Sequence, residues 1–368
     1  MGIQAEEIAA VLRQFGVDYD AFQIETFHSG HINSTHRVVT RYKGVSDAFV
    51  AQRINTYVFP DPVGIMENID LVTGHIRQKL VEAGIDPARR VLNFLKRSDG
   101  TNYFFESRES FWRVYHFVPN TVTYDKAEDP SILTSAGAAF GTFQRQLADL
   151  DMALLKETMP GFHDTPRRFQ NLMKAVRADS EGRLAEVEKD VAAIEEYQDL
   201  WSRLVRLHDE GTLPYRVTHN DTKYNNVLVD ATTGEAVCVI DLDTVSPGLA
   251  AWDFGDAVRF SGNRAAEDEP DLSRVRLDVE LYEAFASGFI PACREGLTEK
   301  ELETLHLGCV TMAFELSMRF LEDYLRGDKY FRIQRPRHNL YRARNQLALA
   351  LDMVAHLDDC LSINRKYF

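Results

Sequence analysis

Cysteine is scarce in this sequence, and its four cysteines lie far apart. No two of them form a C-x-x-C pair, so their spacing excludes the common zinc sites and gives no sign of a disulfide framework. Each cysteine lies among apolar residues, which is typical of a buried free thiol. We therefore expect buried, unpaired side chains at Cys238, Cys293, Cys309 and Cys360.

Long apolar runs are absent as well. No window reaches the roughly eighteen apolar residues of a membrane-spanning helix. The first residues, MGIQAEEIAAVLRQFG, read as an acidic amphipathic helix and not as a signal peptide. A myristoylation signal would need Ser or Thr at the position of Glu6. We expect a cytoplasmic protein that does not bind membranes.

Basic residues are in the minority. The chain has 42 Lys and Arg against 56 Asp and Glu, which gives a formal net charge of −14. Because an acidic protein repels nucleic acids and anionic membranes, we expect no nucleic-acid partner. A small neutral or cationic substrate is compatible with this charge. With 368 residues, of which 45% are apolar, the chain is long enough for two domains or one large bilobed unit.

The spacing of apolar residues changes near residue 118. Residues 22–118 contain short β-branched and aromatic runs separated by Gly, Asn, Asp and Ser, with one helical stretch at 65–84. Beyond them the spacing is mostly helical. Two short apolar runs, 226–229 and 237–240, interrupt this helical half and predict a hairpin. We expect a mostly antiparallel sheet that carries one helix, followed by a mainly helical half.

One stretch, THNDTKYNNVLVD at 218–230, carries the clearest chemistry. Its His219, Asp221 and Asn226 have the spacing of a kinase catalytic loop, in which the Asp accepts the proton of the substrate hydroxyl and the Asn binds magnesium. The second strand of the predicted hairpin ends at Asp241, where a second carboxylate would meet the first. Mg²⁺ prefers such oxygen ligands. We predict an ATP and Mg²⁺ site with Asp221 as the base and Asn226 and Asp241 as metal ligands.

Two further residues are expected to support this loop. The ring of His219 would hydrogen-bond backbone groups around the loop. Asp253 resembles the D-F-G aspartate by eye but does not directly follow the hairpin, so we expect it to cap or hydrogen-bond the catalytic segment. A direct chemical role for His219, a metal-binding role for Asp253 and a plain solvated turn for the whole cluster remain alternatives.

Residues 215–260 resemble the catalytic and metal loops of the aminoglycoside phosphotransferase and choline kinase-like superfamily. Within it, the segments HNDTKYNN, IDLDTVSPG and DFGDAVRF are similar to N-acetylhexosamine 1-kinases. Four more segments agree, so the resemblance covers most of the chain: GHINSTHRV, AQRINTYVFPDPVGIMENI, PGFHDT and FELSMRFLEDYLRGDKYF. It implies an α+β, protein-kinase-like bilobal fold, with a small β-rich N-lobe (1–118) and a larger, mainly helical C-lobe (119–368).

The resemblance also implies an activity. N-Acetylhexosamine 1-kinases use ATP to phosphorylate the anomeric hydroxyl of N-acetylglucosamine or N-acetylgalactosamine, so the expected products are the 1-phosphate and ADP, with Mg²⁺ as cofactor. Arg319 and Tyr330 align with sugar-contacting positions of that family, and Phe260 is expected to pack nearby, with the sugar held against Asp221. An ion pair on the helix surface is the alternative for Arg319. We expect a monomer or a weak homodimer.

The N-lobe departs from the protein-kinase pattern. HSGHIN at 28–33 takes the place of the nucleotide-covering loop, with one Gly where protein kinases have three. Arg53 takes the place of the Lys of V-A-I-K, and Glu67 either pairs with Arg53 or is a solvated helix acid. Residues 115–118 are either a hinge strand that presents backbone groups to adenine or a plain buried strand. The expected nucleotide-binding residues are Gly30, Ile32, Asn33, Arg53, Glu67, Tyr115, His116, Phe117 and Val118.

Three other functions fit parts of the sequence. An aminoglycoside, choline or other small-alcohol kinase of the same superfamily would use the same loops, and an acidic cleft attracts amines. A catalytically silent nucleotide-binding regulator would keep the fold, and Arg53 is the one feature in its favour. Metal-dependent hydrolysis would need more His or carboxylate ligands than this cluster offers without a bound nucleotide.

Overall fold

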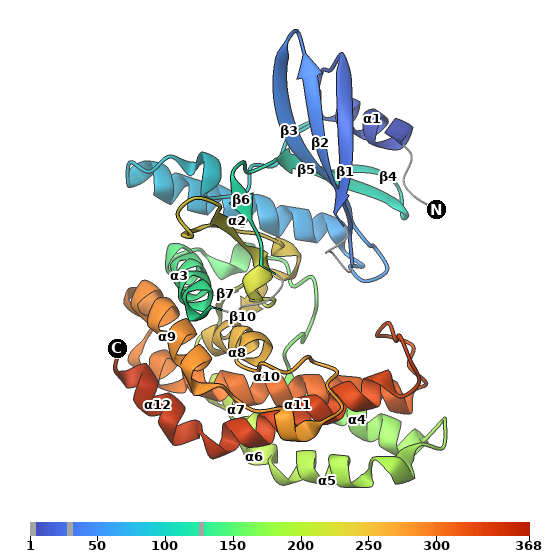
Figure 1. Cartoon of the computed structure of the whole chain (residues 1–368), viewed down its shortest axis with the longest axis vertical. Helices are drawn as coiled ribbons and strands as arrows, with labels where there is room; N and C mark the ends of the chain where they lie inside the picture. Colours follow the sequence, from blue (N-terminus) through green and yellow to red (C-terminus); the bar gives the residue numbers. More distant parts are fainter. Residues whose placement is uncertain (1–4, 28–31, 125–128) are drawn as a thin grey trace.

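The structure, a computed structural model, describes residues 5–27, 32–124 and 129–368. Gly30, expected in the nucleotide-covering loop, lies outside these ranges. Figure 1 shows an antiparallel sheet at one end of the molecule, a group of helices at the other end, and short strands between them. This arrangement confirms the predicted α+β, protein-kinase-like bilobal class.

Five strands form the large sheet, in the order β1-β2-β3-β5-β4, and all neighbouring pairs are antiparallel. Their bounds are β1 Ala21–Phe27, β2 Ser34–Tyr42, β3 Val45–Arg53, β4 Phe104–Ser107 and β5 Ser110–His116. Helix α1 (Ala5–Gln14) covers one face, where Leu12 packs with Ala51 and Trp112. Side chains alternate between the two faces of a strand, so the residues next to Ala51 and Trp112 in sequence face the other half of the chain.

Helix α2 (Pro62–Glu82) is the helix predicted within the sheet region. Its first turn is capped by Asp61, whose side chain accepts the N–H of Gly64 at 3.0 Å. The helix runs beneath the sheet in Figure 1. Its buried Asn68 donates to the carbonyl of Val245 at 3.1 Å, so α2 joins the sheet to the second half of the chain.

Short strands connect the two lobes. β8 (Val227–Asp230) and β9 (Ala236–Val239) form the predicted hairpin, and β6 (Thr121–Val122) extends it to three strands. β7 (Arg216–Thr218) pairs with β10 (Ser246–Gly248). Together the two ladders bring the stretch after β7 beside the turn that joins β9 to β10.

The larger half is built around α10, which is buried along most of its length and begins with a capping box between Thr298 and Glu301. The helices of this half are α3 Pro130–Gln146, α4 Thr165–Ala178, α5 Glu188–Glu196, α6 Gln198–Trp201, α7 Arg203–Asp209, α8 Ala250–Ser261, α9 Val279–Cys293, α10 Glu299–Leu325, α11 His338–Ala355 and α12 Leu357–Arg365.

Helices α8 and α10 approach each other closely at two glycines. A Cβ on Gly255 would overlap the backbone of Gly308, and a Cβ on Gly308 would overlap the carbonyl oxygen of Ala251. Glycine permits this approach because it has no side chain. The contact fixes α8 against α10, and both helices carry residues of the site described below.

The cysteines and the helices bear on two expectations drawn from the sequence, buried free thiols and no membrane-spanning helix. All four cysteine side chains are buried and unpaired, as predicted. Across the described ranges, no helix is long and apolar enough to cross a membrane. The large sheet ends at His116, while a division between lobes at residues 118 and 119 stays a prediction.

Candidate active site

A cavity of about 300 Å³ lies where the large sheet meets the short connecting strands. β3 and β5 line it from one side, and the stretches after β7 and β9 line it from the other. Its charged lining groups, among the residues described, are the cations Arg113 and Lys223 and the carboxylates Asp221, Asp241 and Asp243. The predicted base and the predicted metal-binding aspartate therefore share one cavity.

Asp221 is held by two neighbours in the same loop. Its Oδ1 lies 2.8 Å from Nζ of Lys223, and its backbone carbonyl accepts Nδ2 of Asn226 at 2.9 Å. Because Nδ2 of Asn226 faces Asp221, the amide oxygen of Asn226 is left for another partner. Burial alone would lower the pKa of Lys223, but the carboxylates of Asp221 and Asp256 outweigh it and raise that pKa. Lys223 is thus a fixed cation beside Asp221, and the motif reasoning had not singled it out.

His219 links the catalytic stretch to the end of β9. Its Nδ1 accepts the N–H of Asp221 at 3.3 Å, so its Nε2 carries the proton and donates to the carbonyl of Ile240 at 2.9 Å. The buried ring packs edge-on against Phe140 and Phe143. These are the contacts of a residue that shapes the loop.

Asp253, in the first turn of α8, holds the same stretch from the helix side. Its carboxylate accepts the N–H groups of His219 and Asn220 at 2.9 and 2.8 Å and the side-chain amide of Gln144 at 2.6 Å. Burial raises the pKa of Asp253, and these hydrogen bonds offset part of that effect. Asn220 has a left-handed backbone with φ of 63°, so the bonds hold the chain in a sharp bend.

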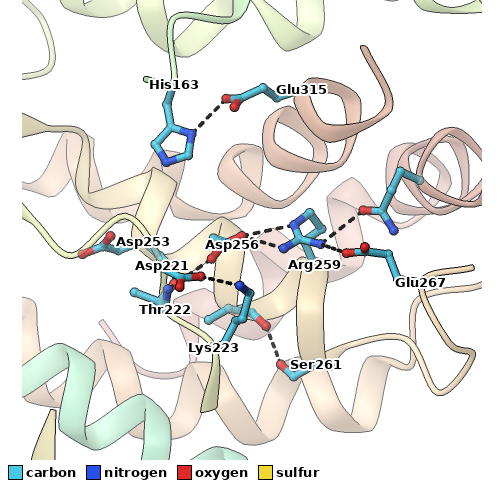
Figure 2. A network of polar contacts seen from close by, with 12 residues as sticks. His163, Asp221, Thr222, Lys223, Asp253, Asp256, Arg259, Ser261, Glu267 and Glu315 are labelled. Atoms are coloured by element: carbon cyan, nitrogen blue, oxygen red, sulfur yellow. Dashed lines mark hydrogen bonds and ion pairs between the residues drawn. The ribbon is translucent and has the colours of Figure 1, made fainter. Parts of the chain in front are cut away.

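A second carboxylate of α8, Asp256, lies at the centre of the network in Figure 2. Its Oδ2 accepts the N–H of Thr222 at 3.1 Å, and its Oδ1 accepts Nε and Nη2 of Arg259 at 3.1 and 2.8 Å. Arg259 also lies 3.4 Å from Glu267. Burial alone would raise the pKa of Asp256, but the cation of Arg259 outweighs burial and lowers it. A charged carboxylate is therefore kept against the catalytic stretch.

The donor set at Asp241 fits a hard divalent cation that a bound ligand helps to hold. Asp241 has a left-handed backbone with φ of 59°, which bends the chain just after β9. Burial, with the nearby carboxylates of Asp243 and Asp221, raises the pKa of Asp241 to about 7, and a cation would relieve this crowding. No three His, Cys, Asp or Glu side chains are grouped as a metal site within the described part of the chain. The amide oxygen of Asn226 and ligand oxygens would have to complete the coordination of Mg²⁺.

Arg53 does not line the cavity, which corrects the expectation that it takes the place of the nucleotide-binding Lys on this strand. Val50 and Gln52 line the cavity. Side chains alternate along β3, so Ala51 and Arg53 face the opposite side of the sheet. The residue at the expected cationic position is Gln52.

The cation on this wall of the cavity comes from the neighbouring strand. Gln52 is the ladder partner of Arg113 in β5, and its Oε1 accepts Nε and Nη2 of Arg113 at 2.8 and 2.6 Å. Nη1 of Arg113 forms a buried ion pair with Asp243. Asn33 donates to the other oxygen of Asp243 at 2.6 Å. The sheet is thereby tied to the turn that carries Asp241.

Glu67 does not pair with Arg53, which corrects one of the two roles expected for it. Its side chain is 54% exposed and lies 3.7 Å from Nζ of Lys156, as for a solvated helix acid. The helix turns the next residue, Asn68, inward instead. From the loop before β2, Ile32 lines the cavity together with Asn33, whereas Gly30 is outside the described residues.

Three of the four expected hinge residues, Tyr115, Phe117 and Val118, line the cavity. The ring of His116 is on the other face of the sheet, where it packs against Phe49 with ring centres 5.2 Å apart. The N–H groups of His116 and Phe117 already donate to backbone carbonyls. At this edge of the cavity, the N–H of Val118 has no partner among the described residues.

Arg319 lies in α10 within an aromatic cluster that is separate from the cavity lining. Its guanidinium is 5.4 and 5.6 Å from the ring centres of Phe162 and Phe331, and its Nη1 is 3.5 Å from Glu315. Its side chain is 15% exposed. Tyr330 is 69% exposed, and its ring packs edge-on against Phe331. Arg319 and Tyr330 thus both pack against Phe331.

Two other aromatic residues lie near these groups, Phe260 beside the catalytic stretch and His163 beside the cluster around Arg319. The ring centre of Phe260 lies 5.8 Å from Nζ of Lys223. Nδ1 of His163 is 3.0 Å from the buried Glu315, and its Nε2 has no partner in the described part of the chain. Figure 2 shows His163 and Glu315 on the side of the network that faces away from Lys223. His163 and Glu315 lie in two of the segments that carry the resemblance, PGFHDT and FELSMRFLEDYLRGDKYF, but neither residue was singled out from the sequence.

Comparison with known proteins agrees with this geometry. Residues 23–286 match the model of a family described as "Phosphotransferase enzyme family". An aminoglycoside phosphotransferase from Alicyclobacillus acidocaldarius is 14% identical, with a TM-score of 0.61 over 100% of this chain and 98% of that one.

Two more solved structures share the fold over nearly the whole chain. A spectinomycin phosphotransferase in complex with ADP and spectinomycin is 14% identical, with a TM-score of 0.55 over 97% of this chain and 99% of that one. A choline kinase from Cryptosporidium parvum is 12% identical, with a TM-score of 0.55 over 97% of each chain. At such identities the likeness shows the fold and does not identify a substrate.

Proposed function

The chain belongs to this phosphotransferase enzyme family, and from that premise we propose that it is an ATP-dependent small-molecule kinase. We propose further that its acceptor is the anomeric hydroxyl of an N-acetylhexosamine, so that the products are the sugar 1-phosphate and ADP. One observation carries the kinase proposal: Asp221 and Asp241 line a single cavity together with Asn226, whose amide oxygen accepts no hydrogen bond from the described residues.

The nucleotide would bind beneath the large sheet. The N–H of Val118, which has no partner in the described part of the chain, would meet adenine, and Tyr115 and Phe117 would line the adenine pocket. The ADP in the spectinomycin phosphotransferase complex supports an adenine nucleotide as the donor. The phosphates would extend toward Asn226 and Asp241, which would hold Mg²⁺. Bound Mg²⁺ neutralises charge on the phosphate oxygens during transfer.

Transfer depends mainly on positioning and charge. Asp221 would accept the proton of the acceptor hydroxyl while the hydroxyl oxygen forms a bond to the γ-phosphorus and the bond to the ADP oxygen breaks. Lys223, paired with Asp221 at 2.8 Å, orients this carboxylate. His219 and Asp253 hold the backbone of the loop, so that Asp221 can stay in line with the phosphate.

The cluster around Arg319 favours a neutral, oxygen-rich acceptor. Its guanidinium packs against Phe162 and Phe331 and donates one hydrogen bond, to Glu315, so other N–H donors remain for sugar oxygens. Arg168 lies close enough that burial and the charge of Arg319 lower its pKa. Arg168 and Arg319 share one carboxylate, Glu315, so the positive charge exceeds the negative charge of this trio and would disfavour a cationic acceptor such as choline or an aminoglycoside.

The catalytically silent regulator has less support than the kinase. Arg53 was the one feature in its favour, and Arg53 is not at the cavity, so its departure from Lys has no bearing on catalysis. Asp221, Asn226 and Asp241 are all present at one cavity. Hydrolysis by a resident metal lacks a sufficient ligand group in the described ranges.

The proposal is tested with a panel of acceptors. ADP release is measured with N-acetylglucosamine, N-acetylgalactosamine, glucose, galactose, choline and kanamycin, and the phosphate position is read by phosphorus NMR. We expect an N-acetylhexosamine to dominate and its phosphate to be on O1. Dominant phosphorylation of choline or kanamycin would overturn the sugar proposal alone, whereas no ATP binding and no ADP release would overturn the kinase proposal.

A further inference from the structure

We propose that Arg113 of β5 is the N-lobe cation of the nucleotide site and takes over the role that a Lys on β3 has in protein kinases. This inference rests on the proposed ATP-dependent function. In protein kinases that Lys meets the phosphates and pairs with a Glu of the neighbouring helix. Here β3 presents Gln52 to the cavity, and Glu67 of α2 is paired with Lys156 at the surface. The cavity therefore lacks both the Lys on β3 and the helix Glu that form this pair in protein kinases.

Arg113 is placed to supply the missing charge. It is the direct cross-strand partner of Gln52, and both line the cavity. Directly opposite residues on one face of a sheet have Cβ atoms about 5 Å apart. Moving the cation from position 52 to position 113 therefore shifts it by one strand without changing the face from which it acts.

The contacts of Arg113 hold its guanidinium in one orientation. Gln52 accepts two of its N–H groups, Asp243 accepts a third, and Nη1 also lies 3.9 Å from Sδ of Met66. One N–H of Nη2 has no partner among the residues that the structure describes, and it would meet a phosphate oxygen. Arg113 is 2% exposed, and a buried guanidinium needs such a fixed set of partners.

The ion pair with Asp243 gives Arg113 a second effect. Asp243 is two residues after Asp241 and is also held by Asn33, from the segment that precedes β2. Arg113 thus positions the turn of the proposed metal ligand while it adds positive charge to the same wall. In protein kinases the partner carboxylate comes from a helix, whereas here it comes from the metal loop itself.

The charge balance of the cavity supports this role. Its described lining contains two cations, and Lys223 is paired with the proposed base Asp221 on the side opposite the sheet. Arg113 is the cation that the sheet contributes to this lining. An ATP tail carries several negative charges, so a site without a cation on the sheet side would leave them poorly compensated.

The test transfers the positive charge from position 113 on β5 to position 52 on β3. ATP binding in the presence of Mg²⁺ is measured by calorimetry for the wild type, Arg113→Gln, the double variant Gln52→Lys/Arg113→Gln, and Arg53→Gln as the matched control. We expect Arg113→Gln to weaken ATP binding by about 10- to 100-fold, since a lost bond to a charged group has this effect. We expect the double variant to regain most of the affinity and Arg53→Gln to bind ATP as the wild type does.

Several results would overturn the inference. These are equal ATP affinity in Arg113→Gln and the wild type, a loss confined to Arg53→Gln, or no recovery in the double variant, which would mean that Arg113 acts only through packing. If circular dichroism shows that Arg113→Gln is unfolded, Arg113→Lys replaces it, with a weakening of about 3- to 10-fold expected and unchanged affinity as the contrary result. A wild type that binds no ATP would remove the proposed function, and this inference with it.

Discussion

The backbone N–H of Thr222 donates a hydrogen bond to the carboxylate of Asp256 at 3.1 Å. Thr222 directly follows Asp221, so a side chain of α8 fixes the backbone beside the proposed base. Arg259 holds Asp256 through two bonds, and Glu267 lies against Arg259, as Figure 2 shows. The position of Asp221 therefore depends on residues that do not line the cavity.

This relationship predicts a defect in turnover from Asp256→Asn. The change removes the charge that Arg259 and the Thr222 N–H both contact, so the catalytic stretch should lose its fixed position. We expect kcat to fall by about 10- to 100-fold, because small displacements of reacting groups have effects of this size. KM for ATP should change little. Asp271→Asn, at an exposed residue that caps a short turn, is the matched control; equal kcat in both variants would contradict the account.

A second prediction concerns Arg319. Arg319→Ala should raise KM for the sugar by about tenfold or more, as expected for the loss of a charged hydrogen bond, and leave KM for ATP nearly unchanged. Arg326→Ala is the control, since Arg326 lies just beyond the same helix and pairs with Glu322 near the surface. Equal increases in both KM values for Arg319→Ala would show that Arg319 supports the fold and does not contact the acceptor.

The spacing of motif residues predicted which side chains come together on one side of the cavity, while the roles assigned to them stay predictions. His219, Asp221 and Asn226 lie in one loop, so local sequence fixes their relation, and the hairpin that brings Asp241 to them is formed by neighbouring strands. The bilobal class was equally visible, because the change from strand-like to helical spacing is a property of long segments. These features depend on contacts between residues that are close in the chain.

The sheet side of the site was predicted less well, for a physical reason. Arg53 matched a motif by position, but a shift of one residue along a strand turns a side chain to the opposite face. The pairing of β3 with β5 decides that Gln52 meets Arg113, and those residues are 61 positions apart. The ion pair of Arg113 with Asp243 spans 130 positions. Such contacts follow from tertiary structure and leave no local pattern.

A third prediction concerns pH and His306, which is buried in α10. Burial, with the nearby charge of Arg203, lowers the pKa of His306 from 6.5 to about 4. As the pH falls below 6.5 the unfolded chain binds a proton before the folded chain does, so the free energy of unfolding falls between pH 6.5 and pH 4. From this residue alone we expect a loss of about 2 kcal/mol between pH 7 and pH 5.

The measurement is urea unfolding of the wild type and His306→Gln at pH 7 and pH 5. His306→Gln should lose less stability than the wild type over this range, because its side chain does not titrate. His356→Gln, at a partly exposed residue after α11, is the matched control for a His-to-Gln change. The same loss in all three proteins would show that His306 does not contribute to the pH dependence.

The central claim is that Asp221 accepts the proton of the acceptor hydroxyl in ATP-dependent transfer, and Asp221→Asn tests it most directly. With the preferred acceptor, ADP release and ATP affinity are measured for the variant and the wild type under the same Mg²⁺ concentration. We predict that kcat falls by about 10²- to 10⁴-fold, the usual contribution of a general base, while ATP affinity stays within about threefold. Turnover near that of the wild type in a folded, ATP-binding Asp221→Asn variant would contradict the account.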